Sequence, residues 1–442
     1  NNKGTEDNRV RKLDYSIQLS ELFYQRFIDN KEITLFSPHS CPGLYESFGT
    51  DKFDELYCRY ESDESIPRTT IGAQELILDL LKERSETGRI YIMNIDHCNS
   101  HSSFKDKVEM SNLCQEITLP TIPISHIDDH LGEIALCILS AVNVGKIRSD
   151  EELEELCDLA VRGLEELIDY QDYPVKAAEL ATKARRSLGV GFIGLAHYLA
   201  KLGYDYGSQE AWDAVHGLSE SFQYYLLKAS NEVAKEKGWC ENFGRTKYSD
   251  GILPIDTYKK DVDEICSQPL QHDWESLRAS ILEHGLRHST LSAQMPSESS
   301  SVVCNATNGI EPPRDYLSIK KSKKGPLKQI VPSYGSLKNN YTLLWEMPNN
   351  TGYINIVSVM QKFFDQAISG NWSYNPEHYE NAEVPVSVMA QDLLTTYKYG
   401  WKTSYYQNTN DMKSDEIDES SLENLLEDLE NANEEECESC AI

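Results

Sequence analysis

The chain has 442 residues, of which 40% are hydrophobic and 26% charged, an ordinary globular composition with room for two or three domains or one large barrel. Its net charge of -30 argues against nonspecific binding to a phosphate backbone, which needs clustered Lys and Arg. No apolar run reaches the roughly 18 residues that a membrane span needs. We therefore expect a soluble protein that binds neither nucleic acid nor membrane.

The 11 cysteines are dispersed along the chain, and the first residues form no secretory signal. Such usage is typical of a reducing cytosol, where a disulfide is more often catalytic than structural. We expect a cytoplasmic protein. The sequence starts without a methionine, which looks like an interruption of a longer chain.

Apolar periodicity divides the chain into helical and strand-like stretches. The pattern predicts helices at 9–30, at 71–81 and over most of 149–238. Strand-like runs are predicted at 89–96, 132–140, 289–293, 343–346 and 403–406. Strands separated by long helical segments favour a mainly parallel α/β arrangement. From Asp411 onward acidic residues dominate and Lys413 is the one basic residue, so 411–442 is predicted to be a flexible tail.

The stretch Ser111–Pro120 lies between two of the strand-like runs. If it is extended, Asn112, Cys114 and Glu116 point the same way, roughly 6.5 to 7 Å apart. An amide, a thiol and a carboxyl could then surround one sugar-sized ligand. A lone cysteine beside a leucine is more often a small buried hydrophobe, and the spacing alone favours that structural interpretation.

Gly189, Gly191 and Gly194 have the spacing of a dinucleotide-binding loop, which requires a strand before it and a helix after it. The upstream residues 177–187 look helical instead. We therefore interpret these glycines as positions of close helix packing rather than as a cofactor site.

His97, Cys98 and His101 are spaced closely enough for a zinc site, to which Cys437 and Cys440 could add ligands. The favoured alternative is that both histidines are hydrogen-bonded structural residues at the end of a strand. We expect no metal.

Three other patterns allow either a functional or a purely structural interpretation. Residues 296–301 could open a helix whose backbone amides bind an anion, although ordinary capping by a serine-rich loop is favoured if they are taken alone. Cys437 and Cys440 could exchange disulfides between a buried site and an outside reductant, or be incidental exposed thiols. Tyr405 and Tyr406 could be packing residues or an electron and proton relay.

Short motifs then follow one another in a set order. They are Asn-Arg-Val-Arg at 8–11, Thr-Leu-Phe-Ser-Pro-His at 34–39, Thr-Gly-Arg-Ile-Tyr-Ile at 87–92, Ser-Asn-Leu-Cys at 111–114, Ala-Leu-Cys at 135–137, Met-Pro-Ser-Glu at 295–298, Asn-Ala-Thr-Asn-Gly-Ile-Glu-Pro-Pro-Arg at 305–314 and Tyr-Tyr-Gln-Asn-Thr at 405–409. With the terminal cysteines, they closely resemble the large catalytic subunit of class I, aerobic ribonucleoside-diphosphate reductase of the enterobacterial and T-even-phage type, over essentially the whole chain.

The resemblance implies that 1–410 is the C-terminal portion of a ten-stranded α/β barrel with a central finger loop around 111–120, followed by the disordered acidic tail 411–442. It implies radical-based reduction of ribonucleoside diphosphates to 2'-deoxyribonucleoside diphosphates for DNA synthesis. No cofactor is expected on this chain, since a metal-containing small subunit supplies the radical. ATP and deoxynucleotide effectors are expected mainly on a missing N-terminal portion. The source would be a bacterial cell or a phage.

Four residues match the reacting groups of that family. Cys114 would become the thiyl radical that removes the ribose 3'-hydrogen. Glu116 would accept the 3'-hydroxyl proton, and Asn112 would hold the substrate. Cys137 matches one of two cysteines that supply reducing equivalents and close into a disulfide.

Other matches concern substrate binding and radical transfer. Glu298, Ser299 and Ser300 match the substrate and phosphate-binding loop, with serine at Ser299 where relatives carry threonine. Tyr405 and Tyr406 match the relay from the small subunit.

Cys437 and Cys440 match the tail pair that re-reduces the active-site disulfide and is recharged by thioredoxin or glutaredoxin. Their Cys-x-x-Cys spacing is narrower than in many relatives, which leaves the external reductant open. The chain lacks a match to the cysteine that pairs with Cys137, so we expect it to need a complementary N-terminal piece and to be inactive alone. The alternative is a non-catalytic fragment that binds the small subunit or thioredoxin, and a zinc-binding module is a more distant one.

Overall fold

The computed structural model describes residues 13–322 and 325–410. Its strands are β1 (Ser16–Leu19), β2 (Glu32–Phe36), β3 (Arg68–Gly72), β4 (Tyr91–Asn94), β5 (Ile138–Asn143), β6 (Leu188–Ile193), β7 (Leu317–Ser322), β8 (Gly325–Ile330), β9 (Trp372–Tyr374), β10 (Thr403–Ser404) and β11 (Gln407–Thr409). Its α-helices are α1 (Glu21–Ile28), α2 (Leu44–Ser47), α3 (Lys52–Ser62), α4 (Ala73–Thr87), α5 (Ile95–Ser100), α6 (Asp150–Tyr170), α7 (Lys176–Arg185), α8 (Leu195–Leu202), α9 (Gln209–Lys237), α10 (Pro254–Thr257), α11 (Trp274–His284), α12 (Glu298–Val303), α13 (Tyr334–Leu337), α14 (Thr351–Gln361) and α15 (Val386–Lys398). Short 3-10 helices are η1 (Pro38–Ser40), η2 (Val144–Lys146), η3 (Phe243–Arg245), η4 (Lys247–Asp250), η5 (Lys260–Glu264), η6 (Lys338–Asn340), η7 (Leu344–Glu346), η8 (Pro376–His378) and η9 (Glu380–Ala382).

The described strands form several short sheets, which confirms a mixed α/β fold. β4 pairs in parallel with β1 and antiparallel with β10, while β5–β6 and β9–β11 are parallel pairs. The pairs β2–β3 and β7–β8 are antiparallel. Within the described residues the expected closed barrel is not found, because Val190 to Ser292 and Gln294 to Ile368 meet through single bridges rather than continuous ladders.

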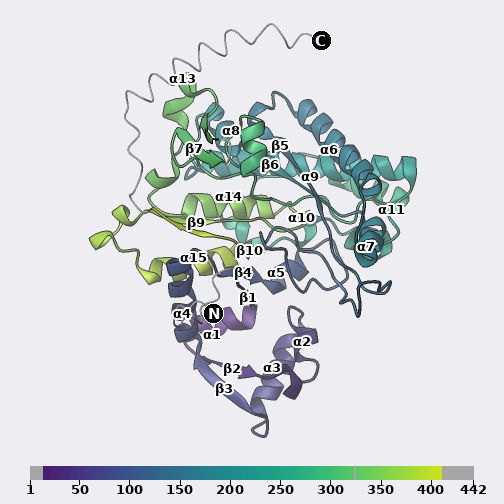
Figure 1. Ribbon diagram of the computed structural model, residues 1–442, viewed down its shortest axis with the longest axis vertical. Helices are drawn as coiled ribbons and strands as arrows, with labels where there is room; N and C mark the ends of the chain where they lie inside the picture. The colour runs from purple at the N-terminus through teal and green to yellow at the C-terminus, as the bar shows by residue number, and fades with distance from the viewer. Residues whose placement is uncertain (1–12, 323–324, 411–442) are drawn as a thin grey trace.

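The hydrophobic core lies in the large body of the molecule (Figure 1), between the long helices and β6. α14 runs through its centre, and ten of its eleven residues are buried. A helix that is apolar on nearly every side is stable only in such an interior position. The small lobe below the body carries α2, α3, β2 and β3 and has its own cluster around Cys41, Leu44 and Tyr57.

The predicted helical region 149–238 is confirmed in α6, α7, α8 and α9 but is interrupted by β6. The expectation of helix across the glycine-rich run was therefore wrong. All six residues of β6 are buried, so this strand has no polar face and lacks the alternation that marks a half-exposed strand.

We had expected the three glycines to mark close helix packing, and this was wrong. Gly189 and Gly191 lie in β6, and Gly194 directly follows it. A Cβ at Gly189 would lie 2.9 Å from the Cys137 sulfur, and one at Gly191 would lie 2.6 Å from the Ala293 carbonyl oxygen. Gly194, at φ +81°, lies against Asn143. The absence of side chains here lets neighbouring segments approach closely.

Several other element predictions need correction. The predicted helix 9–30 holds β1 and α1, its first residues lie outside the described chain, and the predicted strand 132–140 begins only at β5. Of residues 289–293, Ser292 forms one isolated bridge, to Val190, and the predicted strand at 343–346 is the 3-10 helix η7. The predicted strands at 89–96 and 403–406 are confirmed in β4 and β10, and the helix at 71–81 in α4.

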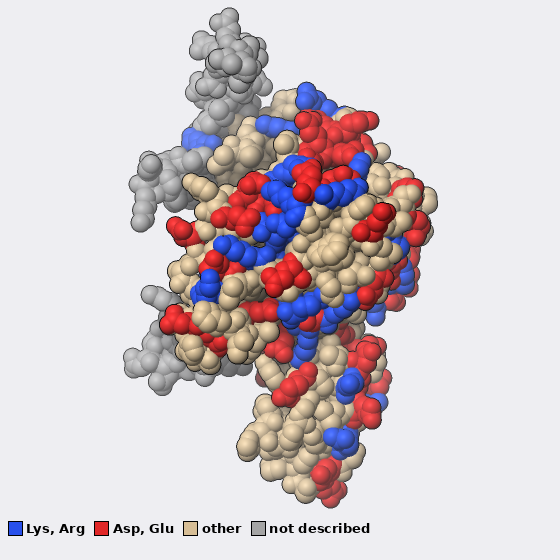
Figure 2. Space-filling view, turned by 90° about the vertical axis from the view of Figure 1, so that its right-hand side faces the viewer, with Lys and Arg blue, Asp and Glu red and all other residues tan. Residues whose placement is uncertain are grey.

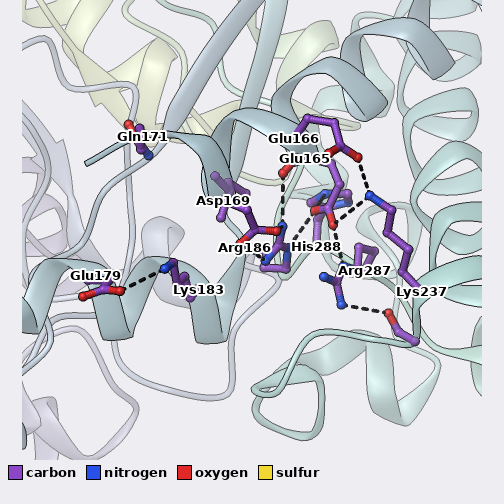
Figure 3. Close-up of polar contacts among 12 residues, drawn as sticks. Glu165, Glu166, Asp169, Gln171, Glu179, Lys183, Arg186, Lys237, Arg287 and His288 are labelled. Carbon is purple, nitrogen blue, oxygen red and sulfur yellow. Dashed lines mark hydrogen bonds and ion pairs between the residues drawn. The ribbon is translucent and has the colours of Figure 1, made fainter. Parts of the chain in front are cut away.

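A buried ion network joins α6 to the start of β6 (Figure 3). The Glu165 carboxylate, 1% exposed, accepts from Arg186 Nε at 2.6 Å and Arg287 Nε at 2.7 Å, and His288 Nε2 lies 3.0 Å from it. Arg186 also binds Asp169 at 2.7 Å. Arg186 lies two residues before Leu188, the first residue of β6. The network therefore anchors the chain at the point where it enters the strand.

The surface mixes both signs of charge. Figure 2, which faces the side of α7 and α11, shows Lys and Arg interleaved with Asp and Glu over the large body. Among the described helices, none combines the length and apolarity that crossing a membrane requires.

Candidate active site

The segment around Cys114 is a tight turn rather than the extended stretch that we expected. Gln115 has φ +73°, its N–H donates to the Asn112 carbonyl oxygen at 3.2 Å, and the Asn112 N–H donates to the Ile117 carbonyl oxygen at 3.3 Å. Leu113 at the tip is 59% exposed. A chain reversal closed by these hydrogen bonds removes the alternation of faces on which the expectation rested.

The turn nevertheless brings the three predicted side chains together. Asn112 Nδ2 donates to Glu116 Oε2 at 2.8 Å, and Asn112 Oδ1 accepts from the Ile117 N–H at 3.0 Å. The Ser369 hydroxyl donates to the Cys114 carbonyl oxygen at 2.5 Å and lies 3.2 Å from Glu116 Oε2. The amide and the carboxyl are thus hydrogen-bonded beside the half-buried thiol.

Burial is the largest influence on the pKa values of Glu116 and Cys114. It raises the pKa of the Glu116 carboxyl, and the hydrogen bonds from Asn112 and Ser369 act in the opposite direction. It also raises the pKa of the Cys114 thiol, while the Tyr405 hydroxyl lowers it. A raised carboxyl pKa suits a group that takes up a proton.

Tyr405 is the aromatic residue that contacts the thiol. Its hydroxyl lies 3.5 Å from the Cys114 sulfur, and its ring centroid lies 4.1 Å from that of Tyr406. Burial, followed by the Cys114 contact, raises the pKa of Tyr405 far above its ordinary value, so the phenol keeps its proton. Tyr91 packs against both rings, with centroids at 4.7 and 5.4 Å. Sequence reasoning missed Tyr91, although its motif was recognised.

A cavity of about 890 Å³ opens beside these residues. Its lining includes Glu298, Ser299 and Ser300 together with Tyr405 and Tyr406. Asn112, Cys114 and Glu116 do not line it themselves, but Ser369 and Tyr405, which do, contact Glu116 and Cys114. The predicted helix opening at 296–301 is confirmed, since α12 begins at Glu298. This volume falls within the usual range for small-molecule sites.

Cys137 lies just before β5, with its sulfur turned inward against Gly189. Gln366 Nε2 donates to that sulfur at 3.5 Å. Burial raises the pKa of the Cys137 thiol to about 12, and the hydrogen bond from Gln366 opposes this rise. Cys114 and Cys137 are both free thiols and flank the Gln366–Ser369 segment.

Residues 366–369 were not anticipated from the sequence. The Ala367 N–H donates to the Glu116 carbonyl oxygen at 3.0 Å, and Gln366 and Ser369 touch the turn through their side chains. The signal that could have found them is the polar pair Asp365 and Gln366 inside an otherwise apolar run, because buried polar side chains need specific partners.

The histidines of the proposed zinc site are structural. His97 Nδ1 lies 2.9 Å from the Trp401 carbonyl oxygen, and His101 contacts Thr257 Oγ1 at 2.8 Å and the Gln361 carbonyl oxygen at 2.7 Å. In the part of the chain that the structure describes, no group of three His, Cys, Asp or Glu side chains could hold a metal. The predicted ligands and redox pair Cys437 and Cys440 lie outside the described residues.

Fold and site together define an α/β protein in which a turn cysteine meets a tyrosine pair beside a cavity. The chain belongs to the family described as ribonucleotide reductase, barrel domain, which matches residues 1–336 and 334–407.

Similar proteins found by sequence comparison carry names from the same family. The Haemophilus influenzae ribonucleoside-diphosphate reductase subunit alpha is 59% identical over 94% of this chain and 56% of its own length. The Escherichia coli ribonucleoside-diphosphate reductase 1 subunit alpha is 54% identical over 95% of this chain and 56% of its own. The subunit alpha of phage T4 is 43% identical over 93% and 55%. The chain therefore spans little more than half the length of these relatives.

Proposed function

We propose that this chain carries the catalytic centre of a ribonucleoside-diphosphate reductase large subunit and takes part in radical reduction of ribonucleoside diphosphates to deoxyribonucleotides. The observation that carries the proposal is the 3.5 Å contact between the Tyr405 hydroxyl and the Cys114 sulfur, beside the hydrogen-bonded Asn112–Glu116 pair. A thiol that touches a phenol is placed for hydrogen-atom exchange, which a structural cysteine does not need.

In the proposed reaction, Tyr406 and Tyr405 pass the radical to Cys114 by proton-coupled electron transfer. The Cys114 sulfur then takes the hydrogen atom from ribose C3', and Glu116 accepts the proton of the 3'-hydroxyl. Asn112 holds the substrate while the 2'-hydroxyl takes a proton from Cys137 and leaves as water. Cys137 and a second cysteine form a disulfide as they supply two electrons and their second proton, which leaves hydrogen at C2'. Cys114 then returns its hydrogen atom to C3', Glu116 returns its proton to the 3'-oxygen, and the radical passes back to Tyr405.

The cavity supports a nucleotide substrate by its size and by the hydroxyl groups at its rim. Ser299 and Ser300 are exposed at the start of α12 and would donate to phosphate oxygens, and Glu298 would bind a sugar hydroxyl. Tyr405, which contacts the Cys114 sulfur, lines the same cavity, so a ribose bound there would lie near the reacting thiol.

The proposal also assigns partners. A metal-containing small subunit would generate the radical, and thioredoxin or glutaredoxin would recharge Cys437 and Cys440. A large-subunit segment corresponding to the rest of the relatives' length would complete the site and carry effector sites. Apolar side chains near Cys137 support such packing, since Leu131 is 86% exposed and Leu139 42%. We place the reaction in the bacterial cytoplasm.

The test measures deoxynucleotide formation from a ribonucleoside diphosphate in a mixture of this chain, a class I small subunit, the complementary large-subunit polypeptide and a dithiol reductant. We expect Cys114→Ser to lower the rate by at least about a thousandfold, because serine forms no comparably accessible radical. The matched control Cys58→Ser changes an exposed cysteine on α3 and should keep full activity. Retained activity in Cys114→Ser would refute the proposal.

A further inference from the structure

Gln366 connects the thiol of Cys137 to the turn that holds Cys114, residues 111–120, which we call the finger turn. Its amide nitrogen donates to the Leu188 carbonyl oxygen at 2.9 Å and to the Cys137 sulfur at 3.5 Å, and its amide oxygen accepts from the Thr118 N–H at 3.3 Å. The side chain is fully buried. One amide group therefore contacts the start of β6, the thiol and the turn at the same time.

These partners determine which way the amide points. If its oxygen and nitrogen were exchanged, an N–H would face the Thr118 N–H and the amide oxygen would face the Leu188 carbonyl oxygen. Both contacts would be repulsive in a buried site. The N–H group must therefore face the Cys137 sulfur.

The backbone of Gln366 is held as firmly as its side chain. The buried Lys402 ammonium donates to the carbonyl oxygens of Phe364 at 3.3 Å, Asp365 at 3.0 Å and Gln366 at 2.8 Å. The Asp365 carboxylate accepts from two backbone N–H groups at 2.9 Å each, those of Leu291 and Ser292. A segment anchored at this many points keeps its amide donor in place when the thiol changes its charge.

The surroundings of the Cys137 sulfur otherwise oppose a negative charge. Burial disfavours the thiolate, and the carboxylates of Glu116 and Asp365 act in the same direction. The Gln366 N–H is the group that acts in the other direction.

We propose that Gln366 is a positioning residue that holds the Cys137 thiol beside the finger turn and stabilises its thiolate form through the amide N–H. This role rests on the proposed function, in which Cys137 gives up its proton as it supplies reducing equivalents. Gln366 contacts the Cys137 sulfur and the Thr118 N–H, so we place its effect on the reaction at Cys137.

The experiment measures how fast iodoacetamide alkylates Cys137 in the full chain, followed by peptide mass spectrometry. The thiolate attacks the iodoacetamide carbon, an S–C bond forms, iodide leaves and the thiol proton goes to solvent. Gln366→Met keeps the volume of the side chain and removes its donor. We expect alkylation of Cys137 at pH 8 to slow by about tenfold, as for a lost hydrogen bond to a charged group.

Two controls separate this effect from a loosened structure, and a second variant repeats the test. Cys114 in the same sample should alkylate at its wild-type rate, because Gln366 does not contact its sulfur. Gln407→Leu removes another buried amide that faces a sulfur, that of Met389, and should leave Cys137 unchanged. Gln366→Glu is the second variant: a protonated carboxyl has a single donor for two acceptors and an ionised one has none, so Cys137 should again slow.

An unchanged or faster rate at Cys137 in Gln366→Met and Gln366→Glu would overturn the proposal. A faster rate there would mean that loosened packing had raised access to this half-buried thiol. The assay does not depend on reductase activity, so its outcome is independent of the proposed function. If Cys137 slows while the complemented mixture still reduces nucleotides at the wild-type rate, the thiol effect is real and its assigned part in the reaction is wrong.

Discussion

Glu116 shows how a single residue acquires its chemistry from its neighbours. Burial alone would favour the neutral acid, which cannot accept a proton. The hydrogen bonds from Asn112 and Ser369 partly restore the carboxylate. In the proposed reaction the amide of Asn112 would therefore have two uses, because it favours the ionised form of Glu116 and also holds the substrate.

Asn112→Ala should lower the complemented reductase activity at neutral pH by about tenfold, the effect of one lost hydrogen bond to a charged group. The pKa of Glu116 lies above its ordinary value and would rise further without Asn112. Because the base must be ionised, activity is lost as the pH falls through this pKa, and the acidic limb of the pH profile should move to higher pH. A profile with an unmoved acidic limb would contradict this use of Asn112.

At the scale of elements, the site depends on where β6 begins. The network around Glu165 joins α6 to Arg186 just before the strand (Figure 3). Further along, Gly189 in β6 lies against the Cys137 sulfur. Burial acts to raise the pKa of Glu165, but the hydrogen bonds from His288, Arg186 and Arg287 outweigh it and hold the pKa well below its ordinary value. The carboxylate is therefore strongly stabilised by the fold.

Glu165→Gln should lower the free energy of unfolding by about 3 kcal/mol, since breaking a buried pair leaves uncompensated charge. Because the folded-state pKa is depressed, the contribution of Glu165 is present above the unfolded pKa near 4.3 and is lost as the pH falls below it. The difference in free energy of unfolding between wild type and variant, measured by urea denaturation, should therefore become smaller toward pH 3. Glu179→Gln, which removes a partly exposed carboxylate on α7 that pairs with Lys176 and Lys183 at the surface, is the control and should change stability little. A difference that does not depend on pH would count against the network.

At the scale of the whole molecule, the strand that follows Cys137 has one paired edge. Within the described residues β5 pairs with β6 alone. Leu136, just before β5, and Leu139, within it, are exposed. An open edge with apolar neighbours is a surface for another strand. This is where we propose that the complementary large-subunit segment packs.

Adding the complementary polypeptide should slow hydrogen exchange of the β5 amides, from Ile138 to Asn143, by at least about tenfold. The antiparallel pair β2–β3 in the small lobe is the internal control, because its strands are already paired with each other. Equal exchange of β5 with and without the added polypeptide would show that the second segment packs elsewhere.

Much of this protein could be predicted from its sequence, for physical reasons that are local. The amphipathic period of α6 and the serine that caps it indicate that helix directly. The residue types at Asn112, Cys114 and Glu116, and their family motif, are properties of a short stretch of chain. What failed were predictions that depend on long-range burial: β6 is apolar on both faces, and the 3-10 helix at 344–346 resembles a short strand.

The sequence by itself determined which reacting groups are present and the family to which they belong, because both depend on residue identity and order. Only the tertiary structure decided how those groups meet. It replaced an extended segment by a turn, brought Tyr405 to Cys114 across 291 positions of sequence, and placed Gln366 between Cys137 and that turn. Such contacts arise from packing around a shared core, and no local pattern of residues specifies them.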